Sequence, residues 1–586
     1  MNPLQNIIFP TMAQVNDDSL YYRCLKGEVD YIFDNDKPFF TIKRNSIVSF
    51  ASYYNYFSLN TWFRYCNFSE LKFFIKGTGK FVLKFFSKSN NSPDILVDSF
   101  NVNLTPNQFF SCSLNITAPM QYSALYCRVE SKSNTSLHSM CFYVDDTPVN
   151  EIKLGIVITH FNRKQYVVPA MKRISSKLFS DDYFRQRMEL VVIDNSKNIT
   201  ISESYGSKVI PNDNLGGSGG FTRGLIYLKE NGFSHCLFMD DDACCELESI
   251  KRTFRLLQFS SRERLAISGG MLYEHMPTVL HEKGAKFNKL KFISLRNGTD
   301  VSDFNNVVLL DSLPEKISYG AWWFFAFKIS DVSAYPFPFF VKADDMLFGL
   351  LNNFNIISPN GIAVWGEDFG YKDGPLQRYL VTRGKLAASL IVRQSSVLRI
   401  LSDFMRSVIS MLLSYRYSSA QAICLGMIDF MKGPSWWVNN MSFNEILKSI
   451  SGCLNDEKME PVELCNYDIE HKSIHESRYR RFLRLITLNG VLLPDILIRK
   501  NYVINEKSGC GIFRIIFRSK YVIYFQSATG KGYITQLNRL RFFKQLVSAL
   551  IISIKFVFKY KHLVKSYSGD AKKIMTEEFW LNVYKE

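Results

Sequence analysis

The spacing of apolar residues divides the chain into three regions. Up to about residue 150, aromatic and β-branched runs such as ELKFFIKGTGKFVLKFFSK and ALYCRVESKS alternate with polar positions and end in turn residues. This period-two pattern predicts a β-sandwich over residues 1–150. Such modules often bind carbohydrate through exposed aromatic side chains, although any single aromatic residue is better explained as core. Gly77-Thr78-Gly79 lies between two alternating runs and predicts a hairpin turn.

Residues 151–386 show a different spacing of apolar residues. Four apolar runs, KLGIVITHFNR, MELVVIDNSK, KVIPNDNLGG and SHCLFMDDD, predict buried strands with helical patterns between them. This alternation is typical of an α/β domain whose mostly parallel sheet has helices on both faces. Ligands of such sheets bind at the carboxyl ends of the strands. The polar segments 160–163, 194–195, 214–220 and 240–242 all fall at those ends.

Residues 387–586 predict a mainly helical region, with a hairpin around Gly530 to Gly532. The segment FFKQLVSALIISIKFVFKYKHLVK is apolar, but Lys555 interrupts it too early for a membrane span. It predicts a basic amphipathic helix. Two roles for this helix stay open, contact with a bilayer surface and packing against a partner such as a second copy of the chain.

Composition narrows the class of protein. An apolar content of 47% and an aromatic content of 15% exclude a mostly disordered chain. The N-terminus lacks the basic start and apolar centre of a secretory signal, and we therefore expect a cytoplasmic protein. Twelve cysteines follow no regular framework, so reduced thiols are expected.

The net charge of +17 is unevenly placed, because residues 513–573 hold thirteen of the Lys and Arg residues and one acidic residue. Nucleic acid, anionic lipid or a phosphate-bearing glycolipid would suit this charge. No nucleic-acid-binding signature accompanies it. The charge therefore favours a peripheral position on the inner face of the cytoplasmic membrane, and no nucleic-acid partner.

The strongest candidates for ligand binding lie in residues 213–246, which read DNLGGSGGFTRGLIYLKENGFSHCLFMDDDACCE. The glycine-rich turn offers backbone amides to a phosphate. At the end of an extended strand, Asp240 and Asp242 should share one face and hold Mg²⁺ or Mn²⁺, while Asp241 points away. Taken alone, the glycine-rich segment is explained by an ordinary turn and the aspartate run by a helix cap in solvent. Together they indicate binding of a nucleotide diphosphate-sugar.

A second constellation lies downstream. Trp322 and Trp323 suit the apolar face of a sugar ring, and Asp344-Asp345 follows an extended apolar run. A carboxylate at such a cleft suits general-base activation of an acceptor hydroxyl. Without the first motif, a buried Trp pair and a helix-capping aspartate would explain these residues better.

The motifs THFNR, VIDNS, NDNLGGSGGF, FMDDD, AWW, VKADDMLFG and GIAVW resemble, in order and spacing, those of the polymerising galactofuranosyltransferases. These are inverting family 2 glycosyltransferases of the GT-A fold, known from mycobacterial galactan synthesis. The N-terminal stretch and LNGVLLPDILIRK are similar as well. The resemblance implies a GT-A domain between a β-sandwich and a helical region, and a hexosyltransferase that uses UDP-galactofuranose and Mn²⁺ or Mg²⁺. The implied acceptor is a glycan or glycolipid of a cell-wall or O-antigen polysaccharide.

The resemblance also implies roles for individual residues. Asp345 would be the catalytic base, with Asp344 beside it, and Asp240 and Asp242 would bind the metal ion. The donor would contact Thr159, Phe161, Arg163, Asp194, Asn214, Gly216, Gly217 and Asp241. The acceptor would contact Trp322, Trp323, Asp344 and His281.

Two positions depart from the family pattern. Gly366 stands where the family has a metal-binding histidine. Either water or a nearby carboxylate such as Asp368 would complete the metal site, or metal binding would be weaker. Ala285 stands where the family has an acidic residue near the acceptor. Two alternatives stay open, namely a GT-A transferase with another UDP-hexopyranose donor and a catalytically weak glycan-binding or scaffold protein.

Overall fold

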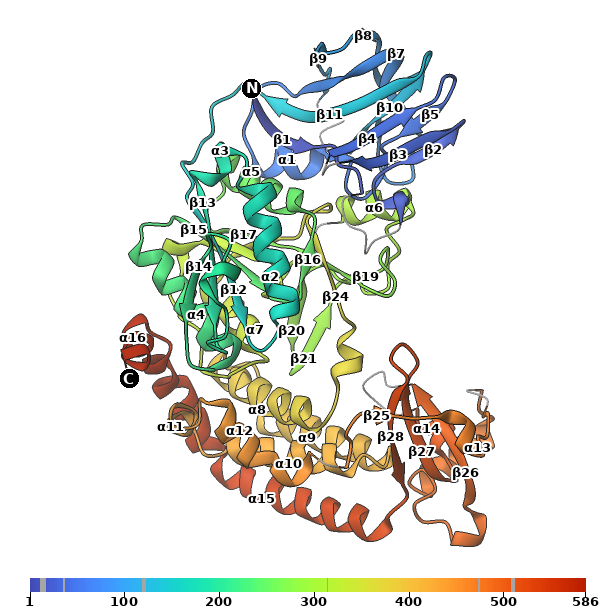
Figure 1. Cartoon of the computed structure of the whole chain (residues 1–586). Helices are drawn as coiled ribbons and strands as arrows, with labels where there is room; N and C mark the ends of the chain where they lie inside the picture. The colour runs from blue at the N-terminus through green and yellow to red at the C-terminus, as the bar shows by residue number, and fades with distance from the viewer. Residues whose placement is uncertain are drawn as a thin grey trace.

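The computed structural model describes residues 1–10, 17–34, 37–117, 123–313, 315–454, 456–472, 475–506 and 512–585. An antiparallel β-structure at the N-terminus rests on a central α/β domain, and long helices run beneath that domain to a small C-terminal sheet (Figure 1). The predicted arrangement of an α/β domain between a β-rich and a helical part is therefore confirmed.

The N-terminal part is an antiparallel sheet that curls into two layers joined by one long strand, β7 (Lys72–Lys88). Its first half pairs with β11 (Thr135–Val144) and its second half with β10 (Ala124–Ser131). The hairpin predicted at Gly77-Thr78-Gly79 is wrong, because β7 continues through it. A Cβ atom on Gly77 would lie 2.3 Å from the backbone oxygen of Ser136, so glycine permits the close crossing of β7 and β11.

The central sheet has the order β14-β13-β12-β15-β22-β17-β23. The first four strands are parallel, and β22 runs antiparallel to both its neighbours. The strands are β12 (Leu154–His160), β13 (Met188–Asp194), β14 (Lys208–Pro211), β15 (His235–Asp240), β17 (Leu265–Ser268), β22 (Phe325–Lys328) and β23 (Asn355–Ile357). The nearly continuous burial of β12, β13 and β15 explains their unbroken apolar sequences.

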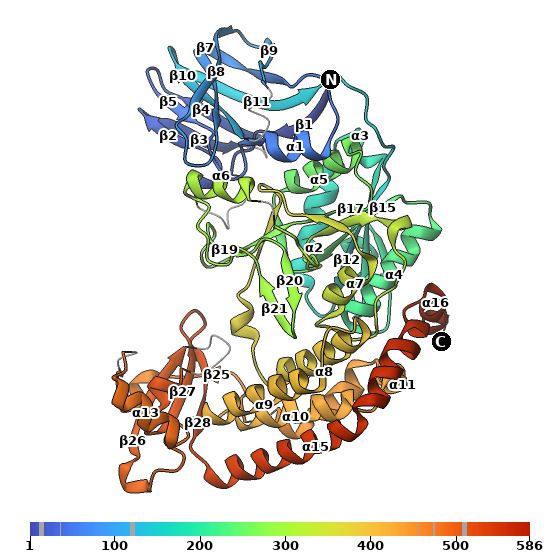
Figure 2. The ribbon, with the colours of Figure 1, turned by 180° about the vertical axis from the view of Figure 1, so that it is seen from behind.

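A second, smaller sheet stands beside the carboxyl ends of these strands. It has the order β16-β24-β18-β19, from β16 (Cys244–Cys245), β24 (Ala363–Gly366), β18 (Gly270–Tyr273) and β19 (Leu280–Glu282). The hairpin of β20 (Ala285–Asn288) and β21 (Lys291–Ser294) projects from it toward the C-terminal helices (Figure 2). Phe287 and Leu290 of this hairpin are buried in the same apolar cluster as those helices.

The C-terminal part is mainly helical, as predicted. Its long helices are α8 (Pro375–Ile391), α9 (Val397–Leu413), α10 (Tyr417–Phe430) and α15 (Arg539–Gly569). A four-stranded sheet is inserted before α15, and its strands β27 (Ser519–Gln526) and β28 (Lys531–Gln536) form the hairpin expected near Gly530. No described helix is both long enough and apolar enough to cross a membrane.

The chain returns at its end to the central domain. Helix α16 (Glu577–Lys585) packs against α4 (Gly216–Glu230), the glycine-rich helix. Trp580 is fully buried there, and the Tyr584 hydroxyl donates a 2.6 Å hydrogen bond to the backbone oxygen of Gly219. The glycine-rich helix is thus fixed by residues from the opposite end of the sequence.

The described cysteines are all free, and Cys510 lies outside the described residues.

Candidate active site

A cavity of about 540 Å³ opens between the carboxyl ends of the central strands and the smaller sheet. Ten of the residues predicted for the site line it. They are Arg163, Gly217, Asp240, Asp241, Asp242, His281, Trp322, Trp323, Asp344 and Asp345. The glycine-rich turn, the aspartate run, the Trp pair and the second aspartate pair therefore meet in one place, although more than a hundred residues separate the first from the last in sequence.

The first residues of α4 approach the cavity closely. Gly216 has a φ of +68°, and a Cβ atom on it would lie 2.2 Å from the backbone oxygen of Phe340. A Cβ atom on Gly217 would lie 3.3 Å from Oδ2 of Asp344. The Gly216 amide donates to Asn214 Oδ1 and the Ser218 amide to the Phe340 oxygen. The positive end of the helix dipole lies at the cavity, which favours a phosphate there. The glycines are needed because the 340–344 segment packs directly against them.

The aspartate run is held by two cationic side chains. Arg163 Nη1 lies 3.1 Å from Oδ1 of Asp241 and 2.6 Å from Oδ2 of Asp242. Lys372 Nζ lies 3.3 Å from the same Asp242 oxygen. The prediction that Asp241 points away from the cavity is wrong, because β15 ends at Asp240 and the strict alternation of a strand ends with it.

Asp240 is the carboxylate best suited to a metal ion. No described residue donates a hydrogen bond to its side chain, and burial, with the charges of Asp242 and Asp241, raises its pKa to about 8. Bringing a divalent cation between Asp240 and Asp242 would relieve this repulsion. Two carboxylates and the oxygens of a diphosphate form a hard ligand set that suits Mg²⁺ or Mn²⁺. Among the described residues no three His, Cys, Asp or Glu side chains are gathered as metal ligands.

Position 366 reaches this cavity but contributes no side chain. A Cβ atom on Gly366 would lie 2.7 Å from the terminal carbon of Met271. Asp368 does not line the cavity, because its carboxylate accepts a 2.8 Å hydrogen bond from the Gly370 amide and caps a short helical turn. Glu367 lines the cavity instead and pairs with Lys372 at 3.3 Å.

Asp344 and Asp345 open α7 (Asp344–Asn352) after a strained approach. Phe340, Lys342 and Ala343 all have φ between 70° and 76°, a region unfavourable for side chains other than glycine. Ser218 Oγ of the glycine-rich helix donates to Oδ2 of Asp344 at 3.2 Å, and the Met346 amide donates to Oδ1 of Asp345 at 2.7 Å. Burial raises the pKa of both carboxyls, and the charge of Asp345 raises that of Asp344 further.

The two tryptophans have different surroundings. Trp322 is packed between Phe221, Phe238 and Phe348, but its Nε1 is buried without a hydrogen-bond acceptor. Trp323 donates from Nε1 to the Gly269 oxygen at 3.0 Å and stacks on Phe369. The unsatisfied Trp322 donor is a polar atom that a bound hydroxyl would satisfy.

Other predicted site residues lie beside the cavity rather than in its lining. Asp194 is buried, and its oxygens accept hydrogen bonds from the amides of residues 196, 198 and 199, so it shapes the loop after β13. Asn214 Oδ1 accepts from the Gly216 amide at 3.2 Å. Thr159 Oγ1 is buried without a partner, and Phe161 is exposed. Gly216 acts through the close packing described above.

Several lining residues were not predicted, and four of them, Lys342, Glu282, Lys372 and Gln377, are polar or charged. The sequence signal for Lys342 is its place two residues before Asp344, and Glu282 follows His281. Lys372 and Gln377 had no local signal, since they come from a helical turn and a C-terminal helix that fold back onto the domain.

Comparison with known proteins finds distant relatives in sequence. No family model matches the chain. The galactofuranosyltransferase GlfT2 of Mycolicibacterium smegmatis is 22% identical over 434 residues, which cover 66% of this chain and 64% of that protein. GlfT2 of Mycobacterium tuberculosis is 23% identical over 424 residues, covering 67% and 66%. The matches thus span slightly less than two thirds of these relatives.

Among solved structures, the mannosyltransferase PcManGT from Pyrobaculum calidifontis, in complex with GDP-Man and Mn²⁺, superposes with a TM-score of 0.28 at 12% identity. The match covers 53% of this chain and 76% of that one. The sequence relationship and the mixed central sheet agree: the chain is a distant homologue of the GlfT2 galactofuranosyltransferases with a GT-A-like central domain.

Proposed function

We propose that this chain is an inverting, metal-assisted galactofuranosyltransferase. It transfers galactofuranose from UDP-galactofuranose to a glycan or lipid-linked glycan of the bacterial surface. The observation that carries the proposal is that Asp345, the aspartate run and the start of the glycine-rich helix face one cavity. The homology to GlfT2 supports the choice of donor.

The donor diphosphate lies at the start of α4 in this proposal. The positive end of the helix dipole attracts phosphate there, and Arg163 and Lys372 add positive charge beside the aspartate run. Asp240 and Asp242 would hold the divalent cation, which when bound neutralises charge on the leaving diphosphate. Arg163 also keeps Asp241 and Asp242 together when no donor is present.

Asp345 accepts the proton of the acceptor hydroxyl. An inverting transfer needs one such base and no enzyme nucleophile, because the hydroxyl displaces the diphosphate directly at the anomeric carbon. Burial raises the pKa of Asp345 toward the working pH, while the charge of Lys342 counteracts that rise and keeps the carboxylate available. Asp344, fixed by Ser218, couples the base to the helix that binds the donor.

Trp322, Trp323 and His281 form the acceptor side of the cavity in this proposal. The free Nε1 of Trp322 would donate to a sugar hydroxyl, and His281 is oriented by a 3.1 Å contact between its Nδ1 and the Tyr273 hydroxyl. A pyranose donor would use the same groups, so a panel of UDP-sugars decides between the two ring forms.

Helix α15 supports a position at an anionic membrane. Its outer face exposes eight large apolar side chains, whereas its inner face packs on α8, α9 and α10. The exposed residues are Leu540, Phe543, Val547, Leu550, Ile551, Ile554, Val557 and Phe558.

The charge of α15 distinguishes between the two roles left open for this helix, namely contact with a bilayer surface and packing against a second copy of the chain. The helix carries seven Lys and Arg residues and no acidic residue. A second copy placed on the same face would bring like charges together, whereas anionic lipid headgroups would neutralise them. We therefore propose that α15 lies on the membrane surface and holds the active site near lipid-linked acceptors.

The first prediction concerns the base. Asp345→Asn removes the proton acceptor while preserving shape, so transfer from UDP-galactofuranose should fall by about 100-fold or more. UDP binding, measured by calorimetry, should stay within about twofold of wild type. Full activity in this variant would contradict the assignment of Asp345 as the catalytic base.

The second prediction concerns pH. Since the base works deprotonated and its pKa is raised by burial, kcat/KM should fall on the acid side at a pH above the ~4 of an ordinary aspartate. Lys342→Met removes the nearby charge that lowers this pKa, so the acid limb should move further up. If the acid limb of the pH profile of kcat/KM does not move in Lys342→Met, the assignment of Asp345 as the base is contradicted.

The third prediction concerns the cation. Asp240→Asn should weaken Mn²⁺ binding, followed by electron paramagnetic resonance, by about tenfold or more. Lys372→Met should strengthen it, because the ammonium competes for Asp242. Asp213→Asn serves as the matched control, since Asp213 is exposed and pairs with Lys197 outside the cavity. Equal Mn²⁺ affinity in Asp240→Asn and Asp213→Asn would refute the site.

The fourth prediction concerns α15. Ile554→Asp with Phe558→Asp should reduce co-sedimentation with phosphatidylglycerol vesicles by about tenfold or more, because each buried apolar side chain contributes about 1.5–3 kcal/mol. Ile201→Asp, at a residue 94% exposed in the central domain, is the matched control. A wild-type dimer that dissociates in the α15 variant, without vesicle binding, would instead assign this face to a second copy.

A further inference from the structure

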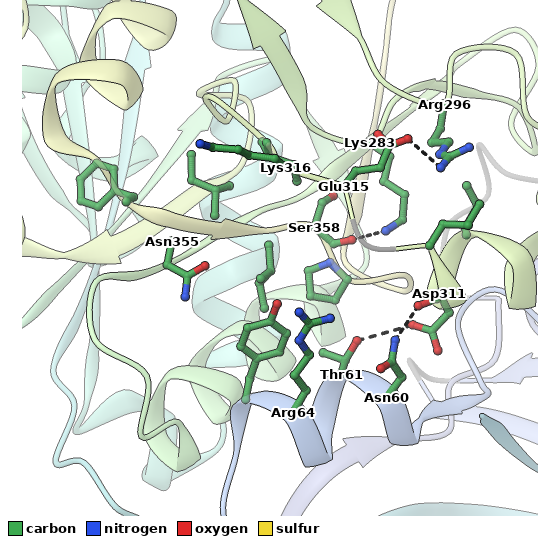
Figure 3. A pocket seen from close by; sticks show the side chains of 18 residues that line it. Asn60, Thr61, Arg64, Lys283, Arg296, Asp311, Glu315, Lys316, Asn355 and Ser358 are labelled. Atoms are coloured by element: carbon green, nitrogen blue, oxygen red, sulfur yellow. Dashed lines mark hydrogen bonds and ion pairs between the residues drawn. The ribbon is translucent and has the colours of Figure 1, made fainter. Parts of the chain in front are cut away.

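A second cavity, of about 370 Å³, lies between the N-terminal and central domains. It is bounded by α1 (Leu59–Tyr65), the end of α6 (Phe304–Ser312) and residues 354–359 (Figure 3). Its lining holds four cationic side chains, Arg64, Lys283, Arg296 and Lys316, and two acidic ones, Asp311 and Glu315. The function proposed above uses none of them.

Both carboxylates in this cavity already have partners. Asp311 accepts hydrogen bonds of 2.7 and 2.8 Å from Ser58 Oγ, which tie the central domain to the N-terminal one. Glu315 lies 2.6 Å from Nη2 of Arg296. The charge of Asp311 acts on Lys283, whose pKa burial lowers to about 8, but no ion pair among the described residues joins the two side chains.

Three of the four cations make no ion pair with any described residue. Lys283 Nζ donates only to the backbone oxygen of Ser358, and Arg64 and Lys316 have no carboxylate partner in the described part of the chain. Ser358 Oγ, in a residue that is 8% exposed, lines the same cavity without a hydrogen-bond partner. A buried, unsatisfied hydroxyl beside unpaired cations is a combination that an anion with several oxygens would complete.

The second cavity shares a wall with the active site. In the segment from β19 to β21, Glu282 and Ser294 face the active-site cavity, and their side chains are joined by a 2.6 Å hydrogen bond. Lys283 and Arg296, one and two residues further along the chain, face the second cavity. The two cavities therefore lie on either side of the same segment.

We propose that the second cavity binds a carboxylate or phosphate group carried by the acceptor glycan. Lys283, Arg64 and Lys316 provide the charge, Ser358 donates a hydrogen bond, and the amides of Asn60 and Asn355 suit the hydroxyls of the sugar that bears the group. This inference rests on the proposed transfer to a glycan and adds that the acceptor is acidic.

Binding of small anions tests the cavity without any transfer reaction. Inorganic phosphate and methyl glucuronide should bind the full chain in calorimetry or ligand-observed NMR, and uncharged methyl glucoside should bind at least fivefold more weakly. Lys283→Met should weaken both anions by about tenfold. Lys286→Met, in the adjacent strand but outside both cavities, should leave them unchanged.

Two further variants keep the test decisive. Arg64→Gln combined with Lys316→Gln changes only exposed residues and should weaken the anions at least fivefold even if Lys283→Met does not fold. Arg163→Gln reports phosphate that binds in the active site instead. Anion binding that is lost in Arg163→Gln but retained in the second-cavity variants, or no binding at all, would overturn the proposal.

Acceptor kinetics identify the source of the anion. In Lys283→Met, KM for an acidic oligosaccharide acceptor should rise about tenfold, with KM for a neutral one unchanged. Unchanged KM for both, together with lost phosphate binding, would assign the cavity to a free anion and refute the acidic acceptor. If no acceptor is turned over, the proposed transfer fails while the anion-binding result still stands on its own.

Discussion

The structure depends on the close contact between the start of α4 and the segment 340–344. Gly216 can sit there only because it has no Cβ atom, which would otherwise lie 2.2 Å from the Phe340 oxygen. The contact brings the phosphate-attracting end of a helix next to a carboxylate pair that begins another helix. It also requires three residues with unfavourable positive φ, whose strain is offset by the packing around them. In the proposed function, this one interface therefore positions both the donor and the base.

The surrounding charges follow from this arrangement. Seven carboxylates, at positions 240–242, 282, 344, 345 and 367, face a single cavity, and burial raises the pKa of several of them. Arg163, Lys342 and Lys372 reduce the repulsion, but no described residue pairs with Asp240. A cavity of this composition attracts cations, which agrees with the divalent cation of the proposed function.

Much of this could be predicted from local sequence, because buried parallel strands and glycine-rich turns leave strong patterns. The strands ending at His160, Asp194 and Asp240 were all anticipated. The hairpin at Gly77 was not correct, since glycine in an alternating run serves equally well where two strands cross closely. Lys372 and Gln377 could not be anticipated, because their place in the site depends on how the chain after residue 366 returns over the cavity. The predicted orientation of Asp241 was wrong because β15 ends at Asp240, so the alternation of side chains along a strand does not extend to Asp241.

The contact between α16 and α4 has a consequence for how the protein is made. Tyr584 hydrogen-bonds to Gly219, 365 residues earlier in the chain, and Trp580 is buried at the same junction. The glycine-rich helix can therefore reach its final packing only after the residues up to Tyr584 have been synthesised and have folded back. Until then the helix beside the acidic cavity lacks the contact that fixes it.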